Sequence, residues 1–322
     1  ATGPRLAYPL AACPNGRTSP GRMPDFVQRA RFRWAMAAGL LLVGGCGDIN
    51  SFRFYHANRA APATWNAEPG LVRLAPGDQE GLVIPVKING GNVLMFRLDT
   101  LAPVLVTGNE AILSGPGFRT AGPVSIGPEE APTWSGRAVE NIDLALGDLV
   151  LKEHAILLAD VPPDDVDGLI GYDLLRRAVA EADADREVLR LHRPNSFRPS
   201  RTAAAVPLVL ADRRPYVDVH VETSDGRGAY LRLGLALAEP DELVLGPAAA
   251  SALGDGASPL ALTLGGIRLQ GLRARRGEHN DEAADGRLGL GALRDRRFAV
   301  DLPGAFLWIY PPEDDDPTRP GE

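Results

Sequence analysis

The chain has 322 residues, a formal net charge of −7 and a hydrophobic content of 45%. This length is enough for one large domain or two medium-sized domains with a sizeable core. The acidic balance argues against nucleic acid as a partner, because binding to nucleic acid requires a basic face. Thirty-six glycines and 28 prolines indicate frequent turns, and they favour a mostly β protein over a helical one.

Residues that could hold a metal or carry out nucleophilic chemistry are sparse. Neither of the two cysteines, Cys13 and Cys46, lies in the part of the chain that reads as a folded domain, and the five histidines have no ligand-like spacing. The sequence also lacks a Gly-x-Ser-x-Gly elbow and a Gly-x-x-x-x-Gly-Lys phosphate loop. We therefore expect no metal and no cofactor.

The N-terminal region has the order of elements found in an export signal. Residues 1–22 match no familiar element, and Met23 is the start that we predict. Basic residues around Arg31 precede a short apolar run that ends in Val43-Gly44-Gly45-Cys46, which resembles a bacterial lipobox. Residues 23–46 are therefore predicted to be a lipoprotein signal with Cys46 as the lipidated residue, because the run is too short for a confident transmembrane span. An ordinary cleaved signal peptide, or a chance apolar run, is the alternative.

Lipidation at Cys46 implies a protein of the bacterial cell envelope, anchored to a membrane and exposed outside the cytoplasmic membrane. Gly47 follows the cysteine, and it is not the Asp that commonly retains such proteins in the inner membrane. The outer membrane is then the expected location in a Gram-negative bacterium. Residues 47–80 lack a sustained period and are predicted to be a tether.

A first folded unit is predicted over residues 81–195. Residues 82–88 and 93–98 read as strands, and Asn89-Gly90-Gly91-Asn92 between them is a strong hairpin signal. The second strand ends in Asp99-Thr100, and Asp167-Gly168-Leu169-Ile170-Gly171 follows downstream.

Much of this pattern occurs again in residues 204–312, after a predicted hinge at 196–203. Asp285-Gly286-Arg287-Leu288-Gly289 corresponds to Asp167–Gly171, and Asp301 corresponds to Asp183. In each pair the residue numbers differ by 118, and a shared offset over such a span indicates a true internal repeat. Residues 313–322 form an acidic, proline-rich tail that we expect to be disordered.

An apolar strand ending in Asp-Thr, followed by Asp-Gly-hydrophobic-hydrophobic-Gly, resembles one lobe of an aspartic protease of the retropepsin-like and pepsin-like family. The resemblance covers about 230 residues and implies two β lobes of closed-barrel type, related by a pseudo-two-fold axis, with short helices. It also implies that Asp99 is a catalytic acid and that Thr100 locks the two central turns together. Asp167, Gly168, Gly171, Asp285, Gly286 and Gly289 would support the cleft.

The sequence departs from the family pattern in both central turns. Leu101 stands where the family has Gly, which permits backbone angles and close approach that a side chain hinders. In the second lobe, aligning Leu231-Arg232-Leu233 with Phe96-Arg97-Leu98 places Gly234 and Leu235 opposite Asp99 and Thr100. The second catalytic Asp is then missing, and Gly234-Leu235 is a degenerate second site.

Three functions remain open, and we expect a monomer in each case. The first is an envelope lipoprotein that binds an extended peptide or protein segment between its lobes, with peptidase activity lost or altered. The second is an active aspartic endopeptidase in which a loop acid, Glu239, Asp241 or Glu242, supplies the second carboxyl group. The third is a structural envelope protein whose cleft is filled by its own side chains.

Overall fold

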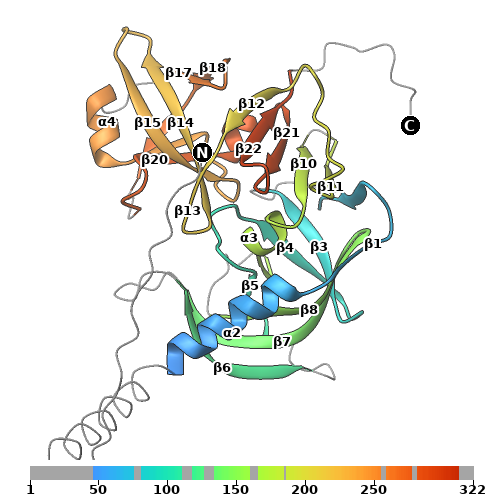
Figure 1. The fold of residues 1–322 in the computed structure, drawn as a ribbon. Helices are drawn as coiled ribbons and strands as arrows, with labels where there is room; N and C mark the ends of the chain where they lie inside the picture. Colours follow the sequence, from blue (N-terminus) through green and yellow to red (C-terminus); the bar gives the residue numbers. More distant parts are fainter. Residues whose placement is uncertain are drawn as a thin grey trace, which may run out of the picture. The chain divides into compact units, whose positions relative to one another are not determined.

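The computed structural model describes residues 46–75, 81–110, 118–126, 134–159, 166–184, 186–254, 259–277 and 281–311. The segment before Met23, the signal region up to residue 45 and the tail 313–322 lie outside these residues. Within them the protein is mostly β and has two lobes, as the sequence predicts (Figure 1). No helix in the described parts is long and apolar enough to cross a membrane.

The first lobe is an eight-stranded sheet with the strand order β1-β8-β5-β9-β4-β3-β7-β6. The buried residues of its strands are mostly apolar. Along β7, residues that face the core alternate with less buried ones. Its strands are β1 (Ala63–Trp65), β3 (Val83–Ile88), β4 (Val93–Leu98), β5 (Val106–Thr107), β6 (Arg119–Ile126), β7 (Trp134–Leu146), β8 (Leu149–Leu158) and β9 (Gly168–Ile170).

The second lobe repeats this arrangement with the order β18-β17-β14-β15-β20-β16-β19, and β13 pairs with β14. Its strands are β13 (Val209–Ala211), β14 (Arg214–Thr223), β15 (Gly228–Ala236), β16 (Leu243–Leu245), β17 (Leu260–Leu264), β18 (Ile267–Leu272), β19 (Ala274–Arg276) and β20 (Gly286–Gly289). The helix α4 (Pro247–Leu253) packs beside β15 and β16.

A six-stranded sheet joins the lobes in the order β12-β22-β21-β10-β11-β2. Strands from both lobes meet where β10 pairs with β21. One continuous hydrophobic core includes buried residues of both lobes. The strands are β2 (Gly70–Arg73), β10 (Val179–Asp183), β11 (Val188–His192), β12 (Ala204–Pro207), β21 (Arg297–Asp301) and β22 (Phe306–Ile309).

The internal repeat is visible in the elements themselves. β9, β10 and β11 begin at residues 168, 179 and 188, and β20, β21 and β22 begin 118 residues later. The short helix α3 (Tyr172–Leu175) likewise corresponds to the 3-10 helix η2 (Leu290–Leu293). The predicted offset of 118 residues therefore relates equivalent strands and helices of the two lobes.

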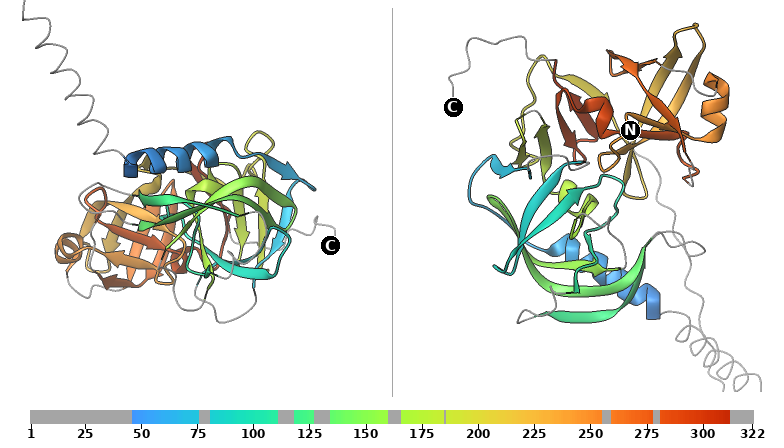
Figure 2. Two further views of the ribbon diagram at one scale, coloured as in Figure 1. Left: turned by 90° about the horizontal axis from the view of Figure 1, so that it is seen from below. Right: turned by 180° about the vertical axis from the view of Figure 1, so that it is seen from behind.

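Residues 47–80 are not a simple tether, contrary to the sequence expectation. Helix α2 (Cys46–Ala60) lies along the first lobe, with Phe54 buried among Val104, Val106 and Leu157 (Figures 1 and 2). β1 and β2 then add to two sheets. The helix escaped prediction because its apolar residues lack a clear 3.6-residue period.

Candidate active site

Asp99 lies directly after β4, where that strand runs parallel to β9. The N–H of Asp99 donates to the carbonyl oxygen of Ile170 at 2.8 Å. Asp167 fixes the start of this pairing, because its N–H donates to Met95 O and its carboxylate accepts from Met95 N–H, both at 2.7 Å. A Cβ at Gly171 would collide with the carbonyl oxygen of Ala102, so this glycine lets β9 approach the turn after Asp99.

The second lobe makes the same contacts. The N–H of Asp285 donates to Arg232 O at 2.7 Å, and its carboxylate accepts from Arg232 N–H at 2.8 Å. The N–H of Leu290 donates to Glu239 O at 2.8 Å, as Tyr172 N–H does to Ala102 O at 2.9 Å in the first lobe. A Cβ at Gly289 would collide with the carbonyl oxygen of Asp241. The predicted supporting positions therefore occupy matching places in the two lobes.

These contacts correct the predicted location of the second site. Met95 corresponds to Arg232, and Ala102 corresponds to Glu239, so both pairs differ by 137 in residue number. Asp99 then corresponds to Ala236, and Gly234 corresponds to Arg97. The placement of Gly234 and Leu235 opposite Asp99 and Thr100 was wrong by two residues.

The physical reason is the period of a β-strand. A shift by two residues keeps every side chain on its original face. Leu231-Arg232-Leu233 and Leu233-Gly234-Leu235 therefore both fit the apolar alternation of Phe96-Arg97-Leu98, and the shared arginine favoured the wrong one. Ala236 also lacks a carboxylate, so the second lobe offers no aspartate at the position of Asp99.

Thr100 connects the two central turns. Its hydroxyl donates to the carbonyl oxygen of Leu235 and accepts from the N–H of Leu237 at 3.1 Å. The Thr100 side chain is fully buried. Leu237 of the second lobe corresponds to Thr100 of the first, so only the first lobe has a hydroxyl at this position.

The carboxyl group of Asp99 is buried, and main-chain N–H groups and two arginines act on it. Its carboxylate accepts from the N–H of Leu101 at 2.9 Å. Burial raises the pKa of Asp99 above its usual value, and the N–H groups of Leu101 and Ala102 and the charges of Arg214 and Arg97 oppose that rise. In a catalytic dyad a second carboxylate would be the dominant neighbour.

Other side chains occupy the space near the second turn. A Cβ on Gly234 would lie 3.5 Å from Cδ2 of Leu101, so Leu101 reaches across to the second lobe. Tyr216 lies opposite Gly234 in the β14–β15 pair. Its hydroxyl donates to the Asp281 carboxylate at 2.8 Å, and that carboxylate lies 3.5 Å from Arg214.

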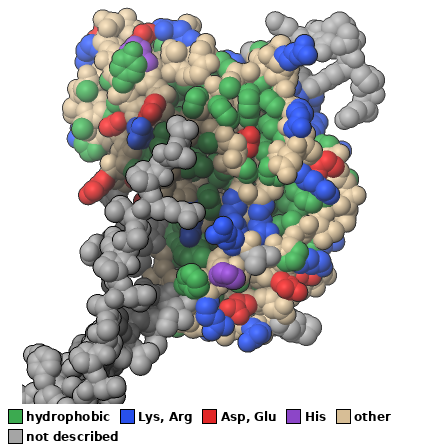
Figure 3. Space-filling model, viewed as in Figure 1, with side chains coloured by type: hydrophobic (Ala, Val, Ile, Leu, Met, Phe, Trp, Pro, Cys, Tyr) green, Lys and Arg blue, Asp and Glu red, His purple; other side chains and the backbone are tan. Residues whose placement is uncertain are grey.

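Sequence reasoning missed Arg97, Arg214 and Tyr216. A signal existed for Arg97, since it precedes Asp99 by two residues and so shares its face of β4. Arg214 and Tyr216 come from β14 of the second lobe, and only the packing of the two lobes brings Arg214 near enough to act on the charge of Asp99. On the face of the molecule drawn in Figure 3, basic side chains gather below a hollow in which hydrophobic side chains are visible.

The loop acids considered as substitutes for the missing aspartate are engaged within the second lobe. Glu239 lies 3.4 Å from Arg275 and 3.6 Å from Arg287, and Asp241 lies 2.6 Å from Arg275. The Glu242 carboxylate accepts from the N–H of Arg273. These pairs hold the three carboxylates in place, and no described contact links them to Asp99. Within the described residues no group of three or more His, Cys, Asp or Glu side chains is placed to hold a metal ion.

Comparison with solved structures supports the fold. The aspartic proteinase from Irpex lacteus is similar with a TM-score of 0.53 and 12% identity, covering 79% of this chain and 98% of that chain. Basic 7S globulin from soybean is similar with a TM-score of 0.52 and 12% identity, covering 75% and 95%. No family model and no curated protein matches the chain in sequence. The chain thus has the pepsin-like fold, with one aspartate at its centre.

Proposed function

We propose that this protein binds an extended peptide segment between its two lobes and does not hydrolyse it. The observation that carries the proposal is the equivalence of Asp99 and Ala236 in two otherwise matching turns. The fold is kept, including the glycines and aspartates that support the turns, while one of the two acids is absent.

Hydrolysis by an aspartic dyad needs two carboxyl groups that share one proton. The charged carboxylate takes a proton from the attacking water, and the protonated group donates a hydrogen bond to the carbonyl oxygen. Asp99 alone cannot be in both states at once. Its cationic neighbours, Arg97 and Arg214, do not replace a proton-sharing acid.

Binding does not require the missing acid. A carboxyl group at Asp99 can hydrogen-bond a peptide amide or carbonyl, directly or through water. Strand-like peptide backbone can also pair with exposed strand edges, with alternate side chains entering pockets.

The test uses residues 47–322, which form one compact unit. The purified protein and its Asp99→Ala variant are incubated with a diverse peptide library from pH 3 to pH 7. We expect neither protein to cleave peptides. The unmodified protein should bind some of the peptides, and the Asp99→Ala variant should bind these more weakly. Cleavage that disappears in the Asp99→Ala variant would show an active endopeptidase and refute the proposal.

We also propose that the protein is an envelope lipoprotein anchored through Cys46. The support is the basic, apolar, Val-Gly-Gly-Cys order of the sequence. Mass spectrometry should find Cys46 acylated at the mature N-terminus, and Cys46→Ala should release the protein from membranes. An unmodified Cys46, or unchanged membrane partitioning of the variant, would refute the anchor.

A further inference from the structure

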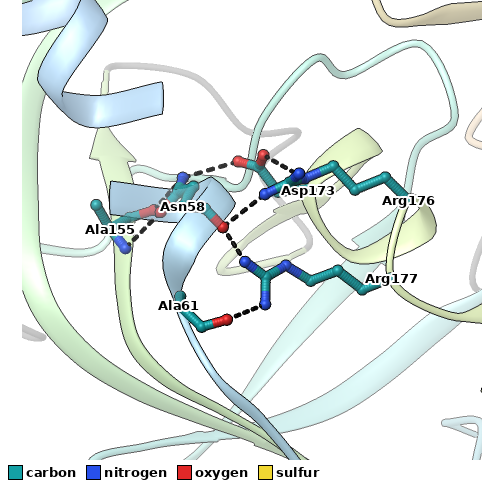
Figure 4. Close-up of polar contacts among 6 residues, drawn as sticks. All are labelled: Asn58, Ala61, Ala155, Asp173, Arg176 and Arg177. Atoms are coloured by element: carbon teal, nitrogen blue, oxygen red, sulfur yellow. Dashed lines mark hydrogen bonds and ion pairs between the residues drawn. The ribbon is translucent and has the colours of Figure 1, made fainter. Parts of the chain in front are cut away.

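Helix α2 is fixed to the first lobe near both of its ends. Toward its start, the hydroxyl of Ser51 donates to the carbonyl oxygen of Ser125 in β6 at 3.1 Å. Toward its end, the amide of Asn58 donates to the carbonyl oxygen of Ala155 in β8 at 2.9 Å (Figure 4). Between these contacts Phe54 is only 1% exposed. The helix is therefore part of the folded body and cannot act as a flexible spacer.

This attachment limits the distance between the proposed lipid anchor and the folded body. Cys46 is the first residue of α2. With a rise of about 1.5 Å per residue, Phe52 lies about 9 Å from Cys46 along the helix axis. The headgroup layer on each side of a bilayer is about 5–8 Å deep. A lipid on Cys46 would therefore hold the start of α2 at the membrane surface, with no spacer between the lipid and the first lobe.

The side of α2 that faces away from the lobe has the composition of a helix that lies in a membrane interface. Phe52, Arg53, His56 and Arg59 are all exposed, and at about 3.6 residues per turn they share one side of the helix (Figure 2). The Phe52 side chain is 69% exposed, and its ring lies 6.1 Å from that of His56. Asp48 is the one acidic residue of the helix. An exposed aromatic ring flanked by arginines suits the boundary between headgroups and acyl chains.

A hollow of about 540 Å³ adjoins this side of the helix. Arg53 and His56 line it, together with Arg119 of β6, Glu140 of β7 and Glu153 of β8. The hollow therefore presents both signs of charge. A phosphatidylethanolamine headgroup also carries both signs, because its phosphate accepts hydrogen bonds from arginine and its ammonium group donates to carboxylates. A purely anionic ligand matches the hollow less well, since the two glutamates would repel it.

We propose that the outward side of α2 rests on the phospholipid membrane, with the Phe52 ring in the interface and a zwitterionic headgroup in the hollow. This inference rests on the proposed anchor at Cys46 and adds the protein surface that meets the lipid. One aromatic ring and a few charged groups bind lipid only weakly by themselves. The anchor keeps their local concentration at the membrane high, so a weak contact is sufficient.

The experiment places a fluorophore at the proposed contact in the mature lipoprotein. The protein is reconstituted in vesicles of phosphatidylethanolamine and phosphatidylglycerol, and Phe52→Cys carries the label. Tyr230→Cys is the matched control, because Tyr230 is an aromatic residue of the second lobe that is 86% exposed. Lipids with brominated acyl chains should quench the label at position 52 by roughly a factor of two or more over the label at position 230.

Charge variants test the headgroup contact. Arg53→Glu combined with Arg119→Glu should reduce quenching at position 52 to the value at position 230. Arg273→Glu combined with Arg276→Glu makes the same change of charge on the second lobe and should leave quenching at position 52 unchanged. All four arginines are exposed, so these variants should keep the fold. Equal effects of the two pairs would overturn the proposed surface.

Mass spectrometry of the same samples separates the anchor from the contact. An unmodified Cys46 would overturn the anchor and this inference together. An acylated Cys46 with equal quenching at positions 52 and 230 would overturn this inference alone. Two other occupants would also overturn it. A second copy would shield the label on residues 47–322 in lipid-free solution as concentration rises, and a protein partner would shield it in native membranes but not in the vesicles.

Discussion

The hydroxyl of Thr100 in the first lobe accepts a hydrogen bond at 3.1 Å from the N–H of Leu237 in the second. The same hydroxyl donates to the carbonyl oxygen of Leu235. One buried side chain therefore joins the turn that follows Asp99 to the turn that follows Ala236. The lobes are connected at their centre although the second turn carries no acid at Ala236 and no hydroxyl at Leu237.

Thr100→Val should destabilise the protein by about 2–4 kcal/mol, because the N–H of Leu237 and the carbonyl oxygen of Leu235 would be left buried without this partner. Thr100→Ser keeps the hydroxyl and should recover most of that loss. The free energy of unfolding of each variant is measured by denaturant titration. Equal stability of the Val and Ser variants would show that the hydroxyl contributes little.

Ala236→Asp should change the titration of Asp99. Two carboxyl groups in matching turns repel each other when both are charged, so one apparent pKa should rise well above the other. We expect no peptidase activity, since Leu101 still occupies the turn where close approach is needed. Carbon NMR of the carboxyl groups between pH 2 and pH 9 follows both titrations.

Gly234→Asp is the matched control, because it places the new acid at the position corresponding to Arg97. Its effect on the Asp99 titration should be smaller than that of Ala236→Asp. A larger splitting with Gly234→Asp would contradict the register that pairs Asp99 with Ala236. Peptide cleavage by Ala236→Asp would contradict the obstructing role of Leu101.

Sequence reasoning recovered the repeat because its markers have local structural causes. Asp167 and Asp285 bond main-chain N–H groups, and Gly171 and Gly289 stand where a Cβ would collide with a neighbouring carbonyl. Few residue types fit such positions, so the same residues occur in both lobes at a fixed spacing and can be recognised in the sequence. The missing second aspartate was also predicted, although at the wrong residue.

The features that were missed depend on packing between distant segments. The two-residue error arose because a period-2 apolar pattern fits two registers, and the shared arginine favoured the wrong one. Helix α2 is held in large part by buried polar contacts of Asn58 and by Arg177, which donates to the carbonyl oxygens of Asn58 and Ala61 (Figure 4). These contacts join residues about 100 positions apart and leave no periodic signal.

Asp173→Asn should make stability less dependent on pH between about pH 4 and pH 6. Burial raises the pKa of Asp173 to about 6, despite Arg176 and the bond from Asn58. The native state then holds this proton more tightly than the unfolded chain, so stability falls as pH rises through this window. The advantage of the Asn variant should grow across the window by up to roughly 3 kcal/mol.

Unfolding of both proteins by urea at several pH values checks this. Asn still offers an amide oxygen to the Nδ2 donor of Asn58. Asp143→Asn is the control: partial burial raises the pKa of Asp143, but hydrogen bonds from Lys152 and from the N–H of Glu153 outweigh this and lower it. The stability that the Asp143 carboxylate contributes should instead be lost as pH falls through its lowered pKa. An advantage of Asp173→Asn that shrinks as pH rises would refute the assignment.

His154→Leu should stabilise the protein, most strongly in acid. His154 is fully buried on β8, and neither ring nitrogen has a hydrogen-bond partner among the described residues. Removing such a buried polar group should raise the free energy of unfolding at pH 7 by about 1–2 kcal/mol. Burial, with the charges of Arg177 and Arg176, lowers the pKa of His154 to about 3.

The histidine is therefore neutral in the native state and takes up a proton on unfolding, so the protein loses stability as pH falls from about 6.5 toward 3. The variant should lack this acid sensitivity.

The repeat supplies a matched control, because buried Leu272 occupies the corresponding position of the second lobe. Leu272→His should lower stability and add a similar loss in acid. Urea unfolding from pH 4 to pH 8 measures both variants. The prediction is wrong if His154→Leu is less stable at pH 7 and still loses stability in acid. The imidazole would then have a partner or a role that the described contacts do not contain.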